Sequence, residues 1–297
     1  MNKPYRIGID LGGTKIEGIV LDPNGRELRR QRIPTQQEHG YLHILHRIKD
    51  LYQDLSTTLR EKKHTLGIGT PGAISPRTGR LKNSNTVCLN GQPLKVELEH
   101  LLGRAVEIQN DANCFAMAEA LFGAGRGKKL VFGVIMGTGC GGGIVHRGEV
   151  LTGLQRIGGE WGHTSINPEG PACYCGQRGC VETYISGGGA EARFAEHYGE
   201  KRSFANLARD YQAGEDRARE FMATFFKHFG RAMANLIDVL DPELVVLGGG
   251  LSNFDALYTD GVAEVAKQVF SDGLDTPILK NQLGDSAGVL GAALIGI

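Results

Sequence analysis

The fold is decided by residues 6–21, whose sequence is RIGIDLGGTKIEGIVL. Residues 6–10 and 16–21 are short apolar segments of the length of buried strands, and residues 11–15 between them form a glycine turn. Two strands joined in this way predict a hairpin whose tip can expose backbone N–H groups. Asp10 ends the first strand, directly before the turn.

The same pattern returns more than 100 residues later. Residues 130–136 are an apolar strand, residues 137–143 (GTGCGGG) a glycine turn, and residues 144–145 resume the strand. The repetition indicates a duplicated half, with a cleft between the two copies. Further strands are expected at 27–34, 106–109 and 244–247, with a strand that ends in a loop at 66–72, and helices are expected at 38–61, 114–122, through most of 191–240 and at 286–297. Alternating strands and helices predict a layered α/β architecture.

Length and composition limit the classes of protein. A chain of 297 residues is long for one core, so we expect a lobe at 1–112, joined by the C-terminal helix at about 286–297, and a second lobe at 113–285. With 33 basic and 33 acidic side chains, nothing favours a nucleic-acid or acidic-lipid partner. No apolar run approaches the roughly 18 residues that span a bilayer, and no signal-peptide core is present. We therefore expect a cytoplasmic protein with no membrane partner, whose six cysteines are reduced.

A metal site is predicted within residues 159–182, GEWGHTSINPEGPACYCGQRGCVE. His163, Cys173, Cys175 and Cys180 match the ligand set of a closed tetrahedral zinc site, which would be structural because no position is left for water. Glycines at 176 and 179 allow the backbone to turn tightly between the thiolates. The alternatives are a disulfide pair or buried free cysteines.

Glycine clusters follow three apolar strands, and together they are able to wrap a nucleotide. None is a Walker loop or a dinucleotide fingerprint. Asp10 would orient a hydrated Mg²⁺, unless it only caps the turn. The expected ATP-binding residues are Asp10, Gly12, Gly13, Thr14, Lys15, Gly137, Thr138, Gly139, Gly249 and Gly250.

Asp111 is the candidate general base, because it lies just past the carboxyl end of a strand, where ligand crevices open in α/β sheets. Its alternative role is to cap the helix that follows. Side chains that mix donors and acceptors suit a polyhydroxylated ligand, and His163 could serve both the metal and that ligand. The expected substrate-binding residues are Gly72, Asn85, Asn110, Asp111, Glu160, His163 and Glu182.

These motifs, in this order, resemble the ROK family of sugar kinases. The resemblance rests on DLGGT at 10–14, NDAN at 110–113, GTG at 137–139, EWGH at 160–163, the cysteines of 173–180 and GGG at 248–250. It implies an actin-like ATPase fold with two RNase H-like lobes, with ATP and Mg²⁺ in the cleft. It also implies Asp111 as the catalytic residue, a structural zinc on the four ligands named above, and sugar contacts from Asn85, Asn110, Asp111, Glu160, His163 and Glu182.

Within that family, residues 82–93, Cys140 and residues 171–175 are most similar to bacterial fructokinase/mannokinase proteins, whereas residues 247–254 resemble N-acetylglucosamine kinases. The expected activity is transfer of the γ-phosphoryl group of ATP to the 6-hydroxyl of a hexose, D-fructose first, with mannose and glucose as further acceptors and N-acetylglucosamine as the alternative. A sugar-responsive repressor is disfavoured because no helix-turn-helix domain precedes Asp10. A non-catalytic binder is disfavoured because Asp111 is present. We also expect a homodimer, for which the sequence carries no direct signal.

Overall fold

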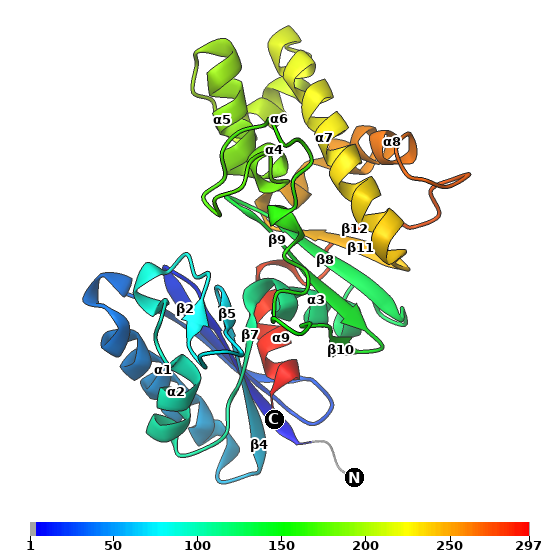
Figure 1. The fold of residues 1–297 in the computed structure, drawn as a ribbon. Coiled ribbons are helices and arrows are strands. Elements are labelled where there is room, and N and C mark those ends of the chain that lie inside the picture. Colours follow the sequence, from blue (N-terminus) through cyan, green and yellow to red (C-terminus); the bar gives the residue numbers. More distant parts are fainter. Residues whose placement is uncertain (1–3, 297) are drawn as a thin grey trace. The chain divides into compact units, whose positions relative to one another are not determined.

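The computed structural model describes residues 4–296, and the chain forms two compact units (Figure 1). Unit 1 comprises Met1–Phe122, Glu149–Gly158 and Leu283–Ile297. Unit 2 comprises Gly123–Gly148 and Gly159–Gln282. Each unit is therefore assembled from segments that are distant in the sequence.

Unit 1 is built on a five-stranded sheet with the strand order β3-β2-β1-β4-β7. β2 is antiparallel to both β1 and β3, while β1, β4 and β7 run parallel. The strands are β1 (Tyr5–Leu11), β2 (Lys15–Leu21), β3 (Glu27–Pro34), β4 (His64–Thr70) and β7 (Glu107–Asn110). The hairpin predicted from residues 6–21 is confirmed, with Asp10 opposite Glu17.

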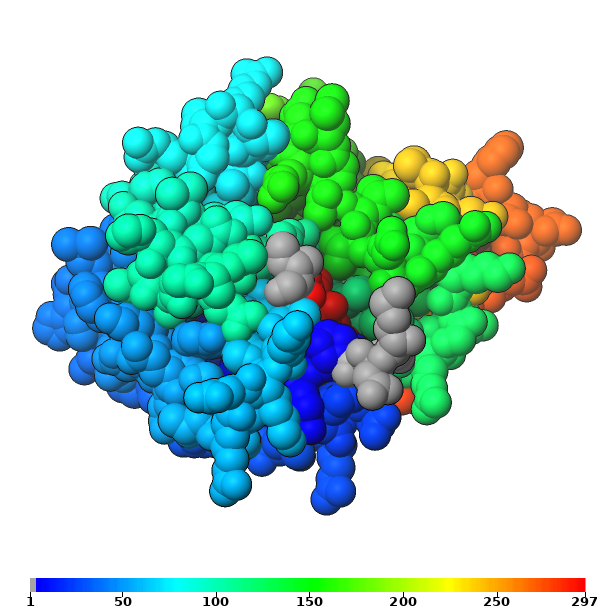
Figure 2. Space-filling model, turned by 90° about the horizontal axis from the view of Figure 1, so that it is seen from below, coloured from blue at the N-terminus to red at the C-terminus, as the bar shows by residue number. Residues whose placement is uncertain are grey.

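Alternate residues of β1 face opposite sides of this sheet, as the pleat of a strand requires. Ile7 and Ile9 are fully buried in a core shared with α1 (Tyr41–Ser56) and α2 (Leu94–Leu102). These two helices cover one face of the sheet (Figure 1), and Figure 2 shows their outer residues at the molecular surface. α1 was expected from the spacing of its leucines and isoleucines, and α2 was not expected.

Gly8, between those isoleucines, faces the other side of the sheet, where α9 (Ala287–Ile295) packs. A Cβ at Gly8 would collide with the backbone of Ala293, and one at Gly67 with the carbonyl of Ala292. α9 also packs on α3 (Asp111–Phe122), because Gly291 lies directly against the carbonyl of Cys114. This packing keeps all of α3 in unit 1, whereas the boundary expected after residue 112 would have divided the helix.

Unit 2 contains a second sheet in which β9, β8, β11 and β12 are neighbours in that order. β9 is antiparallel to β8, while β8, β11 and β12 run parallel. The strands are β8 (Leu130–Met136), β9 (Cys140–His146), β11 (Leu244–Gly248) and β12 (Ile278–Lys280). A hairpin followed by parallel strands is the arrangement of β2, β1, β4 and β7, so the duplication predicted from the glycine turns is confirmed.

The second glycine turn is shorter than expected. Only residues 137–139 form the turn, and the glycines at 141–143 belong to β9. At Gly142 the strand has no room for a side chain, because Trp161 and Phe132 pack directly against it. A Cβ at Gly142 would lie 2.6 Å from the indole of Trp161 and 2.8 Å from the ring of Phe132.

Helices pack against the sheet of unit 2 through aromatic side chains. α7 (Asp216–Leu240) buries Met222, Phe225, Phe226 and Phe229 in the core of this unit, which confirms that its phenylalanine stripe is a core face. It ends where Asp241 adopts a left-handed conformation (φ 46°) before Pro242. The other helices of the unit are α4 (Glu182–Ile185), α5 (Gly187–Tyr198), α6 (Phe204–Gln212) and α8 (Asp260–Ala266).

Short elements complete the described chain, and none of its helices is long and apolar enough to cross a membrane. The short strands are β5 (Ala73–Ile74), β6 (Leu81–Lys82) and β10 (Glu149–Val150), and the 3₁₀ turns are η1 (Gln37–His39), η2 (Thr57–Leu59), η3 (Val87–Leu89), η4 (Trp161–His163), η5 (Gly250–Asn253), η6 (Asp255–Tyr258) and η7 (Gly284–Ser286).

Candidate functional site

Two of the predicted carboxylates lie together in unit 1. Asp10 is near the carboxyl end of β1, and Asp111 is the first residue of α3. Desolvation, followed by the negative charges of Asp111 and Glu17, raises the pKa of Asp10 to about 7. Cys114 lies against the same pair, because a Cβ at Gly69 would be 3.1 Å from its Sγ and 3.3 Å from Oδ1 of Asp10. Burial, followed by the charges of Asp10 and Asp111, raises the pKa of the Cys114 thiol.

Asp111 begins α3 directly, whereas the helix was expected to start at Cys114. The N–H of Ala112 donates to Oδ1 of Asp111 (2.8 Å) and to Oδ1 of Asn110 (2.9 Å). The two residues therefore share the capping of α3. The positive end of the helix dipole also favours its ionised carboxylate.

Asn110 and Gly72 are brought together, since the Asn110 side chain donates to the carbonyl of Gly72 over 3.3 Å. Gly72 has a left-handed conformation (φ 82°), and a Cβ there would collide with the carbonyl of Lys82. Only glycine fits this position, because the turn at Gly72 packs directly against the backbone of Lys82 and of the segment that follows β6. Asn85 lies in that segment and is exposed.

The turn at residues 12–15 links β1 to β2, and the N–H of Gly12 donates to the carbonyl of Lys15 over 2.9 Å. Thr35, which is fully buried, braces the turn from the end of β3. Its hydroxyl donates to the carbonyl of Gly12 over 2.6 Å, and its N–H donates to the carbonyl of Thr14 over 2.9 Å. Sequence reasoning missed Thr35, although it follows Pro34 at the end of a predicted strand.

In unit 2 the turn at residues 137–139 meets a glycine cluster that sequence reasoning also missed. The N–H of Gly187 donates to the carbonyl of Gly137 (2.7 Å), and that of Gly188 donates to the carbonyl of Thr138 (3.2 Å). Gly187 begins α5, which Ser186 caps by accepting from the N–H of Gly189 (2.9 Å). A serine followed by three glycines before an amphipathic segment was the signal available in the sequence.

The third glycine cluster joins the same region. Gly249 follows β11 with φ 78°, and a Cβ there would collide with the carbonyl of Met136, the last residue of β8. Gly250 has open space around it. Unit 2 therefore places the turn at 137–139 beside the start of α5 and close to residues 249–250. The first N–H groups of α5 already donate to Gly137, Thr138 and Ser186, so the backbone that suits an anionic ligand is that of residues 137–139 and 249–250.

Glu160 and Glu182 stand at the two ends of the predicted metal-binding segment. Glu160 precedes η4, and Glu182 begins α4. Oε2 of Glu182 accepts from the N–H of Cys140 over 2.8 Å, and a Cβ at Gly139 would lie 2.6 Å from that oxygen. Glu182 is therefore held directly against the turn at residues 137–139.

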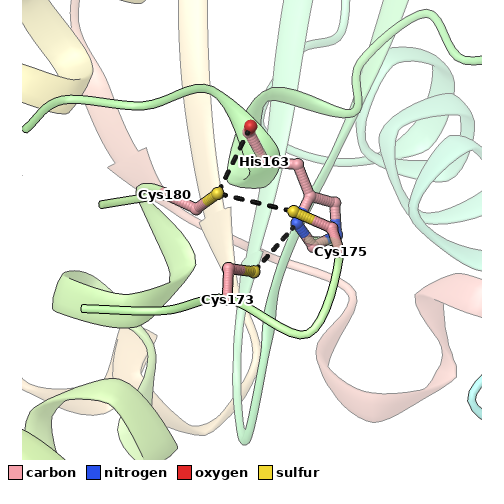
Figure 3. A group of neighbouring side chains, drawn as sticks. All are labelled: His163, Cys173, Cys175 and Cys180. Carbon is pink, nitrogen blue, oxygen red and sulfur yellow. Dashed lines mark hydrogen bonds between the residues drawn. The ribbon is translucent and has the colours of Figure 1, made fainter. Parts of the chain in front are cut away.

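His163, Cys173, Cys175 and Cys180 converge as predicted, and their ligand atoms all lie within 4.8 Å of one another (Figure 3). Nδ1 of His163 is 3.6 Å from Sγ of Cys173, and the sulfurs of Cys175 and Cys180 are 3.6 Å apart. All six cysteines of the described chain are free, so the disulfide alternative is wrong.

The spacing fits zinc. An ion about 2.3 Å from each sulfur of a tetrahedral site sets the sulfurs about 3.8 Å apart, close to the separation found here. Gly176 (φ 89°) and Gly179 (φ 65°) turn the chain between the thiols, as expected. Gly179 lies so close to the carbonyl of Asn167 that a side chain would not fit. The four residues could therefore hold a structural zinc, and we name residues 159–182 the zinc knuckle.

The second ring nitrogen of His163 points to a residue that sequence reasoning missed. Nε2 is 3.1 Å from the hydroxyl of Tyr174, and the two rings meet edge to face with centroids 5.1 Å apart. Desolvation of the hydroxyl, followed by the negative charges of Glu182, Cys173 and Glu160, raises the pKa of Tyr174 to about 12. The phenol oxygen thus contacts one predicted substrate-binding side chain, His163.

Unit 2 also has a cavity of about 380 Å³ between α4, α5 and α7, and none of the predicted site residues lines it. Its walls include Tyr184, Arg193 and His228. Burial, followed by the charge of Arg231, lowers the pKa of His228 to about 4, so this ring is neutral at pH 7.

Comparison with known proteins agrees with these features. The model of the ROK family matches residues 6–296. The N-acetyl-D-glucosamine kinase of Photobacterium profundum is 37% identical over 300 residues, which cover 98% of both chains.

Solved structures agree in fold. The ROK hexokinase of Thermus thermophilus has a TM-score of 0.88 and 34% identity, over 98% of this chain and 97% of that one. A ROK family glucokinase from Streptomyces griseus, in complex with glucose and AMPPNP, has a TM-score of 0.78 and 27% identity, over 98% and 99%. The expected actin-like ATPase fold is therefore confirmed.

Proposed function

This chain belongs to the ROK family, and from that premise we propose that it is an ATP-dependent sugar kinase acting on the 6-hydroxyl of N-acetyl-D-glucosamine. Kinase relatives of known structure share its fold over nearly its whole length. The proposed products are ADP, the sugar 6-phosphate and a proton. A cytoplasmic location and a homodimer remain predictions that accompany this proposal.

The choice of acceptor changes what the sequence first led us to expect. Fructose was preferred because residues 82–93 and 171–175 resemble fructokinase/mannokinase proteins. The most similar relatives compared are instead named N-acetyl-D-glucosamine kinases, at 36–37% identity over 97–98% of this chain. This supports the alternative acceptor, which residues 247–254 had already indicated.

The observation that carries the proposal is Asp111 at the start of α3, next to Asp10. Phosphoryl transfer needs alignment, charge neutralisation and a carboxylate that takes the proton of the acceptor hydroxyl. In this proposal Asp111 accepts the proton of the sugar 6-hydroxyl while that oxygen attacks the γ-phosphorus, and the bond from phosphorus to the ADP oxygen breaks. Asp111 is the first residue of α3, so its carboxylate lies at the positive end of the helix dipole.

Asp10 is the residue that would hold a hydrated Mg²⁺. The fit is chemical, because Asp10 and Asp111 lie together at a desolvated position, whereas Glu17 is already paired with Arg30 and Arg32. Desolvation, followed by the charges of Asp111 and Glu17, raises the pKa of Asp10. A divalent cation bound with ATP would offset this charge and neutralise the phosphate oxygens. The turns at 12–15 and 137–139, with residues 249–250, are the proposed phosphate-binding backbone.

Zinc would cross-link the knuckle on His163 and the three cysteines, and it supplies no chemical step. Its proposed effect is to hold Glu160, His163 and Glu182 still, as donors and acceptors for sugar hydroxyls. Gly72, Asn85 and Asn110 are the corresponding proposed contacts from unit 1.

An acceptor panel tests the proposal. Purified protein is assayed with ATP and Mg²⁺ against N-acetylglucosamine, fructose, mannose and glucose, each over a range of concentrations. We expect the highest kcat/KM with N-acetylglucosamine, and a product phosphorylated at carbon 6 in the ³¹P-coupled NMR spectrum. A higher kcat/KM with fructose would restore the first expectation, and no ATP consumption with any of the four would reject the kinase.

A further inference from the structure

Tyr174 occupies an unusual position, between two cysteines of the zinc knuckle and largely in solvent. Its side chain is 80% exposed, although its hydroxyl is engaged with Nε2 of His163 at 3.1 Å. An aromatic side chain this exposed gains little from burial. Its defined contact is therefore the hydrogen bond to His163 rather than core packing.

The direction of this hydrogen bond follows from the knuckle. Nδ1 of His163 faces Sγ of Cys173 at 3.6 Å, so Nδ1 is the nitrogen that a zinc ion would bind. A histidine that binds metal through one nitrogen carries its hydrogen on the other. With zinc on Nδ1, the Nε2–H of His163 would donate and the phenol oxygen of Tyr174 would accept.

The proposed function gives that same N–H to a sugar hydroxyl. One N–H makes one strong hydrogen bond, so the phenol and the sugar cannot both hold it. We propose that the hydroxyl of Tyr174 competes with the sugar for Nε2 of His163 and so sets the affinity for the sugar. This inference rests on the proposed function and adds to it a residue that tunes sugar affinity.

Few contacts hold the phenol of Tyr174 in place against a competing sugar. Among residues 4–296, its hydroxyl makes this one side-chain hydrogen bond, and its ring contacts one other ring, that of His163. The sugar must replace the hydrogen bond, which lowers the apparent affinity for any acceptor that uses His163.

Two variants remove the competing oxygen. Tyr174→Phe keeps the ring, and Tyr174→Ala removes it. In both we expect the KM for N-acetylglucosamine to fall about two- to fivefold, the equivalent of a hydrogen bond worth about 0.5–1 kcal/mol, with kcat and the KM for ATP unchanged. Phe270→Leu is the matched control, because Phe270 is an aromatic residue of the same unit that is 95% exposed, and its KM should equal that of the wild type.

A spectroscopic readout does not depend on turnover. In ¹⁵N-histidine-labelled protein, the Nε2 resonance of His163 should shift in Tyr174→Phe without sugar. In the wild type it should shift on titration with N-acetylglucosamine, as the phenol is displaced. The zinc content of both variants should match that of the wild type.

Three results would overturn the inference: a KM that is unchanged or raised in both variants, a His163 resonance that is the same with tyrosine and phenylalanine, or loss of zinc in Tyr174→Phe, which would make the phenol only an orienting partner of a zinc ligand. A wild-type protein that phosphorylates no sugar rejects the proposed function instead. A working kinase with the first result rejects the competition alone.

Discussion

Asp10 and Asp111 illustrate how a single residue acquires its chemistry from its neighbours. Neither carboxylate is unusual in the sequence, and each also suits a structural role at a turn or a helix start. Together they place two acids at one desolvated position, where the pKa of Asp10 reaches about 7. The pair therefore favours a bound cation, and a substitution of one aspartate must change the pKa of the other.

Replacing Asp111 with asparagine tests both effects. Asp111→Asn should lower kcat by at least ~10², because it removes the proposed base but keeps the size of the side chain. It should also lower the pKa of Asp10, because a negative charge is lost beside it, which ¹³C-carboxyl NMR titration measures. Asp50→Asn, an exposed position on α1, is the control and should leave both quantities unchanged. Retained turnover would remove Asp111 as the base.

His228 predicts a dependence of stability on pH. Its pKa in the folded state is about 4, below the ordinary value of 6.5, so the folded protein binds fewer protons between these values. The free energy of unfolding is therefore unaffected by the protonation of His228 above pH 6.5 and falls as the pH drops toward 4, because the unfolded protein binds a proton that the folded protein does not. The expected loss is about 1–2 kcal/mol for a partly exposed ring.

Urea unfolding at pH 7.5 and pH 5 measures this loss. His228→Gln should lose less stability between the two pH values than the wild type does. His46→Gln, at an exposed position on α1, should behave as the wild type. Equal losses in all three proteins would show that His228 does not titrate as the structure indicates.

At the scale of elements, the zinc knuckle should fold only with its metal. Four ligand atoms within 4.8 Å of one another, on a segment with little regular structure, leave the loop dependent on the ion. Elemental analysis should find about one zinc per chain in the wild type. Cys175→Ala should lose the zinc, and its melting temperature should fall by several degrees.

Cys88→Ala is the control for that experiment, since Cys88 is a free thiol outside the knuckle, and it should keep its zinc. A strong chelator should lower the melting temperature of the wild type toward that of Cys175→Ala. Equal metal content in the two variants would contradict the assignment of Cys175 as a ligand.

The contact between α9 and β1 should tolerate no added atom at Gly8. The Cβ of Gly8→Ala would meet the backbone of Ala293 and Val289, which cannot turn aside as a side chain can. We expect a loss of about 1–3 kcal/mol in the free energy of unfolding, measured by denaturant titration. Gly273→Ala is the control, because open space surrounds Gly273, and its stability should be close to that of the wild type.

Sequence reasoning found the long elements and the short motifs, but it missed what depends on tertiary contact. The stripe of α7 and the knuckle ligands are visible because their spacing is local. The predicted extent of β9 was wrong, because a run of glycines in the sequence indicates a turn. The contacts of Trp161 and Phe132 with Gly142, which favour glycine within the strand, are visible only in the folded structure. β12 was missed because it has three residues, of which only Ile278 is buried. The contact of Tyr174 with His163 depends on the folding of the knuckle between them.

At the scale of the whole molecule, the duplicated plan could be predicted because each copy begins with the same strand, glycine turn and strand. The limits of the units could not be predicted in the same way. A boundary after residue 112 follows the order of motifs, whereas α3 stays with unit 1 because α9 packs on it. The roles assigned to residues of both units, and the cleft expected between the two halves, stay predictions for the experiments above.

The packing of α9 also has a consequence for how the protein is made. β1 is translated before every strand of unit 2, yet α9, the helix that covers Gly8 and Gly67, is translated only after all of them. Domains usually fold in the order of their synthesis. Here we expect the reverse order: unit 2 can fold on the nascent chain before the sheet of unit 1 is covered. Until α9 is translated, one apolar face of that sheet stays exposed and accessible to chaperones.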